Sequence, residues 1–191
     1  MIRRLTPHAL AVLAAVALAS GPVVAQDATP WTVQPDASTL GFTAELQGAP
    51  VEGRFERFDA AIALDPANPE TGSVTITVDI ASVRSSNAQA DGAIRGADWF
   101  AADSFGQAVF QSDAITGADG AYVAEGTLTI RDESVPVSLP FTLAVDGDTA
   151  QADGTLTLDR TAFGVGQGSW AAPQPVAHEV DVTFSVSATR G

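Results

Sequence analysis

The sequence predicts an all-β protein, an antiparallel β-barrel of about eight strands with one short helical insert. Apolar and polar residues alternate with period two along about eight segments, and Gly, Asp and Pro occupy the connections between them. Residues 85–105, where the alternation stops, form the one helical interruption, and a Gly-rich loop over residues 163–175 precedes the last strand. A β-sandwich would show the same pattern, but nearly every segment is long and apolar on one side, and few helices are available to cover a second face. The barrel is therefore the favoured architecture.

The clearest strand pair lies in residues 122–145, where two alternating segments flank one polar connection. Even-numbered residues from 122 to 130 and odd-numbered residues from 135 to 145 are apolar or small, so each strand has one apolar face. Residues 131–134 form the connection, which is longer than the tightest two-residue turn. Pro136 and Pro140 lack the N–H that a closed ladder uses, which predicts a local gap or bulge there.

The other strands follow in order along the chain. Alternation predicts strands near residues 31–33, 40–46, 51–64, 74–80, 108–110, 150–158 and 180–188. Within residues 51–64 the apolar parity changes from odd to even, so we expect a bulge or sharp bend near Glu56 and Arg57. Residues 88–94 favour a short helix, and the aromatic pair Trp99 and Phe100 follows it. Such a segment can lie over an open end of the β-structure.

The N-terminus has the features of a secretory signal peptide in residues 1–25. Arg3 and Arg4 precede an apolar stretch over residues 10–19, and small residues end at Ala25. The apolar stretch is too short to span a bilayer, for which a helix needs roughly 20 residues. We therefore expect residues 26–191 to form a single exported domain.

The charge and residue types exclude several classes of function. After removal of the signal peptide, the chain keeps seven arginines and all 23 acidic residues, which gives a formal charge of −16. So acidic a protein repels phosphate backbones, and we expect no nucleic-acid partner. The chain has no Cys, which excludes disulfides, thiolate metal sites and cysteine nucleophiles. His178 is the one remaining His, so neither a His-rich metal site nor a Ser-His-Asp assembly is expected. We predict no catalytic residue, no metal and no cofactor.

Six segments, in their order and spacing, resemble the YceI-like family of secreted bacterial proteins. They are WTVQPDASTLGF, VEGRFERFDAAIALDP, SVTITVDIASV, ADWFAADSFGQAVFQSDAI, GTLTIRDESVPVSLPF and LDRTAFGVGQGSWAAPQPVAHEVDVTFSVSA, which together extend over essentially all of residues 26–191. The resemblance implies an eight-stranded lipocalin-like barrel that holds a long apolar molecule in its central cavity.

The inward faces of the strands then provide the candidate ligand-binding residues. Side chains on the apolar parity should form the wall, with the aromatic residues of the loops toward the entrance; the predicted lipid-binding set is Phe42, Phe55, Phe58, Ile76, Val78, Trp99, Phe100, Phe110, Leu128, Ile130, Leu139, Phe141, Leu156, Phe163, Trp170 and Phe184. The alternative is that these residues pack against each other as a filled core. Small inward residues favour a cavity, so Gly126→Phe or Ala152→Phe should abolish ligand retention while the fold is kept. Arg160 either hydrogen-bonds a headgroup or ties its loop to a carboxylate.

The resemblance implies a periplasmic carrier that binds a polyisoprenoid, an isoprenoid quinone precursor or a fatty-acyl derivative, with transient membrane contact, as a monomer or homodimer. Three other classes remain open. An outer-membrane barrel shares the alternation, although its aromatic girdles are missing here. An enzyme that acts on a hydrophobic substrate would need an inward titratable group, and no strand clearly has one. A stress-response protein that acts through a protein partner leaves no sequence signature.

Overall fold

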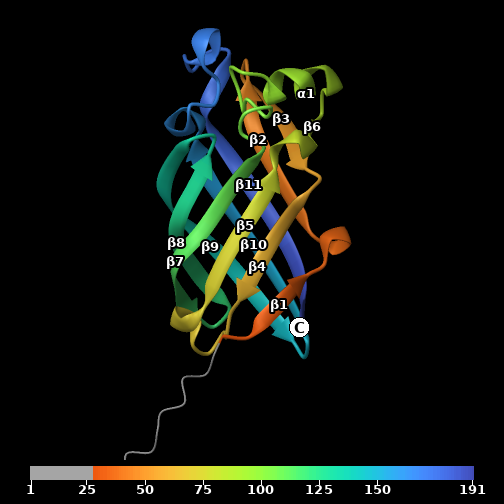
Figure 1. The fold of residues 1–191 in the computed structure, drawn as a ribbon, viewed down its shortest axis with the longest axis vertical. Helices are drawn as coiled ribbons and strands as arrows, with labels where there is room; N and C mark the ends of the chain where they lie inside the picture. The colour runs from red at the N-terminus through yellow and green to blue at the C-terminus, as the bar shows by residue number, and fades with distance from the viewer. Residues whose placement is uncertain (1–27) are drawn as a thin grey trace, which may run out of the picture.

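Eight antiparallel strands close into a barrel in the computed structural model, which describes residues 28–191 and only the backbone of Gln89 (Figure 1). The predicted signal peptide lies outside the described residues. The strand segments are β1 (Pro30–Val33), β2 (Thr39–Leu46), β3 (Ala49–Phe55), β4 (Phe58–Ala63), β5 (Ser73–Asp79), β6 (Val83–Ser85), β7 (Gln107–Ala118), β8 (Ala121–Ile130), β9 (Glu133–Asp146), β10 (Thr149–Asp159) and β11 (Val176–Arg190). The one α-helix among the described residues is α1 (Ala88–Arg95).

Three of the eight barrel strands are interrupted, which is why the chain shows more segments than strands. The ring runs β1-β4-β5-β7-β8-β9-β10-β11 and closes through the pairing of β1 with β11. β2, β3 and β6 extend the wall upward from β11. The 3-10 helix η1 (Pro35–Ala37) interrupts β1 and β2, and η3 (Ile80–Ser82) interrupts β5 and β6. The predicted eight-stranded antiparallel barrel with one short helix is confirmed.

The third interruption, between β3 and β4, is the bend predicted at Glu56 and Arg57. β3 ends at Phe55 and β4 begins at Phe58, so both phenylalanines point inward although their parities differ. The buried Ser82 holds the bend, because its carbonyl accepts the Glu56 N–H at 3.2 Å and its Oγ accepts the Arg57 N–H at 3.0 Å. The inserted residues let the strand curl without turning its apolar face outward.

The β8–β9 connection is tighter than predicted. β8 ends at Ile130 and β9 begins at Glu133, so the turn has two residues, Arg131 and Asp132. The prediction of a longer connection was wrong because Glu133 and Ser134 pair with β8 and belong to the strand. Arg131 has a left-handed backbone with φ of 60°, as tight hairpins require.

The gap predicted from Pro136 and Pro140 is present. β9 pairs with β10 only from Phe141 to Asp146, opposite residues 149–154, and residues 133–140 have no partner in β10. β9 nevertheless remains paired with β8 along its length to Glu133. The two prolines therefore lie on a strand edge that makes no ladder with its second neighbour, where a missing N–H has no cost.

The lower end of the barrel is closed by a compact core. Trp31 packs there with Leu64, Phe110 and Ile115, and small alanines of β8, β10 and β11 fill the remaining space. The indole Nε1 of Trp31 donates to the Leu64 carbonyl at 2.9 Å, which satisfies the one polar atom of this ring. The C-terminus lies at this end, opposite α1 (Figure 1). Among residues 28–191, no helix is both long and apolar enough to cross a bilayer.

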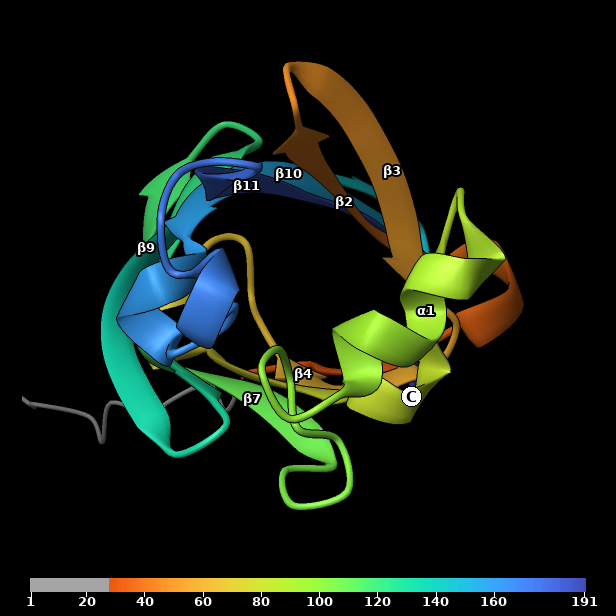
Figure 2. The same cartoon turned by 90° about the horizontal axis from the view of Figure 1, so that it is seen from above.

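The upper end carries α1 and the long connections (Figure 2). The helix confirms the expectation for residues 88–94, with one further residue. Asp91 anchors it, because its buried carboxylate accepts both the N–H and the hydroxyl of Ser85 on β6, each at 2.7 Å. These hydrogen bonds lower the pKa of Asp91 below its ordinary value of 3.8. The helix is thus fixed to the rim of the barrel by a side chain that is ionised at neutral pH.

Candidate binding cavity

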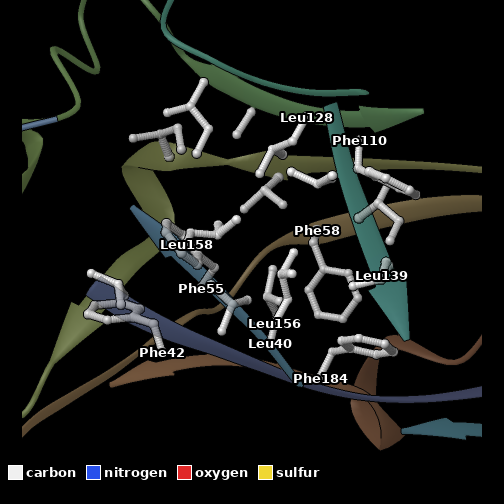
Figure 3. A pocket seen from close by; sticks show the side chains of 18 of the residues that line it. Leu40, Phe42, Phe55, Phe58, Phe110, Leu128, Leu139, Leu156, Leu158 and Phe184 are labelled. Atoms are coloured by element: carbon white, nitrogen blue, oxygen red, sulfur yellow. The ribbon is translucent and has the colours of Figure 1, made fainter. Parts of the chain in front are cut away.

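The middle and upper barrel enclose a cavity of about 390 Å³. Its wall consists of the inward side chains of the strands, together with residues of α1 and the upper connections. Figure 3 shows Phe55, Phe58, Leu139, Leu156 and Phe184 around the same space. Arg160 is the one charged residue on this wall. The size lies within the range of roughly 300–1,000 Å³ that is usual for small-molecule sites.

The interior is hollow above the lower core, which decides between the two predicted arrangements. Phe42, Phe58, Leu128 and Leu156 point inward, yet each remains partly exposed because the inward side chains do not fill the space between them. In a filled core such residues would be fully buried, as Phe110 and Ile115 are. A cavity lined almost wholly by carbon is the kind that excludes water and accepts apolar molecules.

All sixteen predicted lipid-binding residues lie on the cavity wall. Phe110 also belongs to the packed lower core, where it is 6% exposed, so it forms part of the floor. Contact of these residues with a lipid stays a prediction. Sequence reasoning missed further wall residues that share the same strand parities, and the alternation could have found them: Leu40, Val51, Ile62, Val74, Val137, Leu143, Leu158, Val180, Val182 and Val186.

The helix α1 adds wall residues that strand alternation could not indicate. Ala90, Ala93 and Ile94 line the cavity from above. Their spacing of three and four residues places them on one face of a helix. Two of the three are alanines, so the helix covers the opening without filling it.

The inward glycines do not create the cavity, contrary to the sequence prediction. The ring of Phe42 lies over Gly53 and the ring of Phe184 lies over Gly154, each from the directly paired position on the neighbouring strand. Gly126 faces the backbone of Gln111 at the β7 bulge, where a Cβ would collide with the carbonyl oxygen. The expectation that Gly126→Phe keeps the fold was therefore wrong. Ala152, in contrast, lines the cavity.

Aromatic side chains surround the upper part of the cavity. Phe55 lies between Phe42 and Phe100, with ring centroids 5.8 Å and 6.0 Å away. Across the opening, Trp99 contacts Trp170 with centroids 5.5 Å apart. These pairs join β2, β3, the connection after α1 and the connection before β11, so aromatic contacts hold the rim in one arrangement.

Of the two interactions predicted for Arg160, the pair with a carboxylate is absent, and backbone carbonyls take its place. Its side chain is 5% exposed, and all five of its N–H groups are used by backbone carbonyls. Burial lowers the pKa of the guanidinium, while the charge of Asp159 acts in the opposite direction. The acceptors are Ala177 for Nε, Val165 (2.8 Å) and Gly166 for Nη1, and Trp170 (2.7 Å), Val176 (2.9 Å) and Ala172 for Nη2.

The Arg160 guanidinium therefore lies at the centre of the loop before β11, and the carbonyls of this loop surround it. The guanidinium also lies over the Trp99 ring, 5.4 Å from the centroid. Since no N–H remains free, Arg160 holds the loop and cannot bind a headgroup without losing a carbonyl. Throughout the described residues, no buried side-chain nitrogen or oxygen lacks a hydrogen-bond partner. The cavity surface itself is almost wholly carbon, so a ligand inside it meets hardly any polar atom.

Arg131 ties a lid together at the rim. We define the lid as residues 97–105 and 164–175. Nη1 of Arg131 donates to the carbonyls of Trp99 at 2.6 Å and Gly164 at 2.9 Å, one in each lid segment. The carbonyl of Asp98 accepts two N–H groups of the second segment, from Gly166 at 2.8 Å and from residue 167 at 2.6 Å. This role has no signal in the sequence, which predicts Arg131 only as a residue of the connection over 131–134.

His178 is half-buried, and its Nε2 lies 3.0 Å from the Ala171 carbonyl. It lies on β11 outside the cavity wall. Among the described residues, no three His, Asp or Glu side chains gather closely enough to hold a metal ion. The absence of catalytic residues, metal and cofactor stays a prediction.

This geometry defines a barrel with one apolar interior site, and comparison with known proteins places it in a family. Residues 31–188 match the YceI-like domain. The chain therefore belongs to the YceI-like family, which confirms the resemblance seen in the six sequence segments.

Solved structures and curated relatives agree with this assignment. Burkholderia cenocepacia BcnA is 36% identical, with a TM-score of 0.79 over 82% of this chain and 99% of that chain. A polyisoprenoid binding domain from Saccharophagus degradans, implicated in plant cell wall breakdown, shares the fold at 13% identity, with a TM-score of 0.67 over 85% and 99%. A UPF0312 protein of Vibrio cholerae is 34% identical over 88 residues. This match covers 46% of this chain and 47% of the relative, so the matched part is about half of the relative's length.

Proposed function

We propose that this protein is a periplasmic carrier that holds the hydrocarbon chain of a polyisoprenoid or acyl lipid in the barrel. The observation that carries the proposal is the apolar cavity of about 390 Å³, whose wall has one charged residue with no free donor. A polar group placed inside would lose its water without gaining a partner. The buried part of the ligand is therefore hydrocarbon, and the headgroup stays at the rim or outside.

The cavity is large enough for useful binding. A methylene group takes about the 30 Å³ of a water molecule in the liquid, so 390 Å³ has room for about 13 such groups at the least. At about 0.8 kcal/mol per buried methylene, they contribute on the order of 10 kcal/mol before association costs reduce the total. Micromolar binding needs a net binding free energy of about 8 kcal/mol. Because association costs reduce the gross value, the ligand must bury as many methylene groups as the cavity can hold, which favours long or branched hydrocarbon chains.

Membership in the YceI-like family and the polyisoprenoid binding domain of the same fold support an apolar ligand. The predicted signal peptide in residues 1–25 supports export to the periplasm. Binding without catalysis agrees with a wall on which the one charged group, Arg160, is fully hydrogen-bonded. Carriage would involve transient membrane contact, by a monomer or a homodimer.

The test is native mass spectrometry of the protein purified from its own periplasm without detergent, followed by organic extraction. We expect one or more discrete added masses that extract as isoprenoid or acyl lipids. A homogeneous unliganded mass, together with failure to take up added farnesol or palmitic acid, would refute the proposal.

A further inference from the structure

The hydrogen-bond ladder of the barrel wall is interrupted between the upper halves of β9 and β10. We define the β9–β10 slot as the stretch where residues 133–140 of β9 and residues 155–159 of β10 lack ladder pairs with each other. β9 remains bonded to β8 there, and β10 to β11. Each of the two strands is therefore hydrogen-bonded along one edge and unpaired along the edge that borders the slot.

The backbone of β9 is adapted to this missing ladder. The Leu143 N–H donates to the carbonyl of Gly120, which precedes β8. Backbone N–H and C=O groups of odd-numbered residues in β9 therefore point toward β8, and those of even-numbered residues point toward β10. Pro136 and Pro140 are both even, and they remove two of the donors that would line the slot. The β9 edge is therefore poorly able to pair with another strand.

The slot lies beside the cavity and is bounded at both ends. Val137 and Leu139 of β9 and Leu156 and Leu158 of β10 flank it on the inside, and all four line the cavity. At the lower end the strands converge, since a Cβ on Gly154 would lie 2.5 Å from the Pro140 carbonyl oxygen. At the upper end the 3-10 helix η4 (Arg160–Phe163) packs against β9.

The polar side chains beside the slot are turned away from it. Ser138 of β9 donates to Glu125 of β8 at 2.6 Å, and Thr157 of β10 donates to Asp181 of β11 at 2.6 Å. Each side chain thus bonds to the strand on its far side. The charged residues of the slot, Glu133 and Asp159, lie at its upper end, and residues 134–140 and 155–158 below them contain none, in a chain of formal charge −14. A hydrocarbon that passes between residues 134–140 and 155–158 meets no charge that it must desolvate.

We propose that the hydrocarbon chain of the ligand enters and leaves the cavity sideways through the β9–β10 slot, an inference that rests on the proposed function. The alternative route is through the lid, which opens only if Arg131 releases Trp99 and Gly164 and if Asp98 releases its two donors. Widening the slot breaks no ladder hydrogen bond. The slot is therefore the less costly opening in the wall.

The test bridges the slot chemically. The chain contains no Cys, so Ser138→Cys with Thr157→Cys provides two unique thiols at positions that continue the Phe141–Gly154 register. A short bis-maleimide then links the strands, and the same variant capped with N-ethylmaleimide is its reference. The matched control is Thr142→Cys with Asp153→Cys, a pair of the same parity within the intact ladder. Release of a fluorescent polyene fatty acid to phosphatidylcholine vesicles is followed by stopped flow.

We expect bridging across the slot to slow uptake and release at least tenfold with little change in the dissociation constant, and bridging within the ladder to change the rates less than twofold. Arg131→Gln, which loosens the lid, should leave the rates within twofold. Unchanged rates in the bridged slot variant, faster release in Arg131→Gln, or loss of binding on bridging would each overturn the slot route. Absence of binding of both the fatty acid and farnesol by the unaltered protein would instead refute the proposed function.

Discussion

Filling the cavity from Ala152 is the most direct test of where the ligand binds. Ala152 lies on β10, lines the cavity and pairs with Leu143 and Val186. Ala152→Phe adds six ring carbons to a space for about 13 methylene-sized groups. At about 0.8 kcal/mol for each displaced methylene, the loss reaches about 5 kcal/mol if the ligand cannot shift. Because the hydrocarbon chain of the ligand can shift toward the rim, the loss will be smaller than this limit. We expect the affinity for the ligand to fall at least ~100-fold.

The assay is titration with the polyene fatty acid, with circular dichroism and thermal unfolding to establish the fold. Ala144→Phe is the matched control, because it makes the same substitution at an exposed, outward position of β9. It should bind as the unaltered protein does. If folded Ala152→Phe bound within threefold of the unaltered protein, the ligand would lie elsewhere and the reasoning from the cavity would be refuted.

Four further substitutions test the packing of the wall, the loop before β11 and α1. Gly126→Ala should lower thermal stability by more than ~2 kcal/mol because its Cβ meets backbone, whereas Gly92→Ala in α1, with open space around it, should raise stability by about 0.5–1 kcal/mol. Arg160→Met should cost ~3 kcal/mol or more in urea unfolding, since several buried carbonyls lose a charged donor; a smaller loss would contradict its structural role. Asp91 has a lowered pKa, so its stabilisation of α1 is complete above pH 3.8 and is lost as the pH falls through the lowered pKa. Hydrogen exchange of the α1 amides should show this loss of protection at low pH. In Asp91→Asn the protection of α1 should no longer depend on pH in this range.

Much of the fold could be predicted because its determinants are local. Alternation with period two identifies a strand and its inward face from a few consecutive residues, and a parity change requires an inserted residue, as at Glu56 and Arg57. The missing N–H of Pro136 and Pro140 indicated an incomplete ladder for a reason that lies within each residue. The same logic placed all sixteen predicted residues on the cavity wall.

Errors arose where a residue's role depends on a distant partner. Gly53 and Gly154 appeared to leave space, but the rings of Phe42 and Phe184 cover them from neighbouring strands. Arg160 appeared to need a carboxylate, but the loop before β11 surrounds it with carbonyls. In both cases the deciding atoms come from elsewhere in the chain, and strand periodicity contains no information about them.

The sequence by itself determined which elements form, which faces turn inward and that the interior is apolar, because these follow from backbone geometry and the transfer of side chains out of water. Only the tertiary structure decided that the interior is hollow. A filled and a hollow barrel share one alternation, and the difference is free volume, which depends on strand closure and on how side chains from opposite walls meet. The lid held by Arg131 and the slot between β9 and β10 likewise exist only once the barrel has closed.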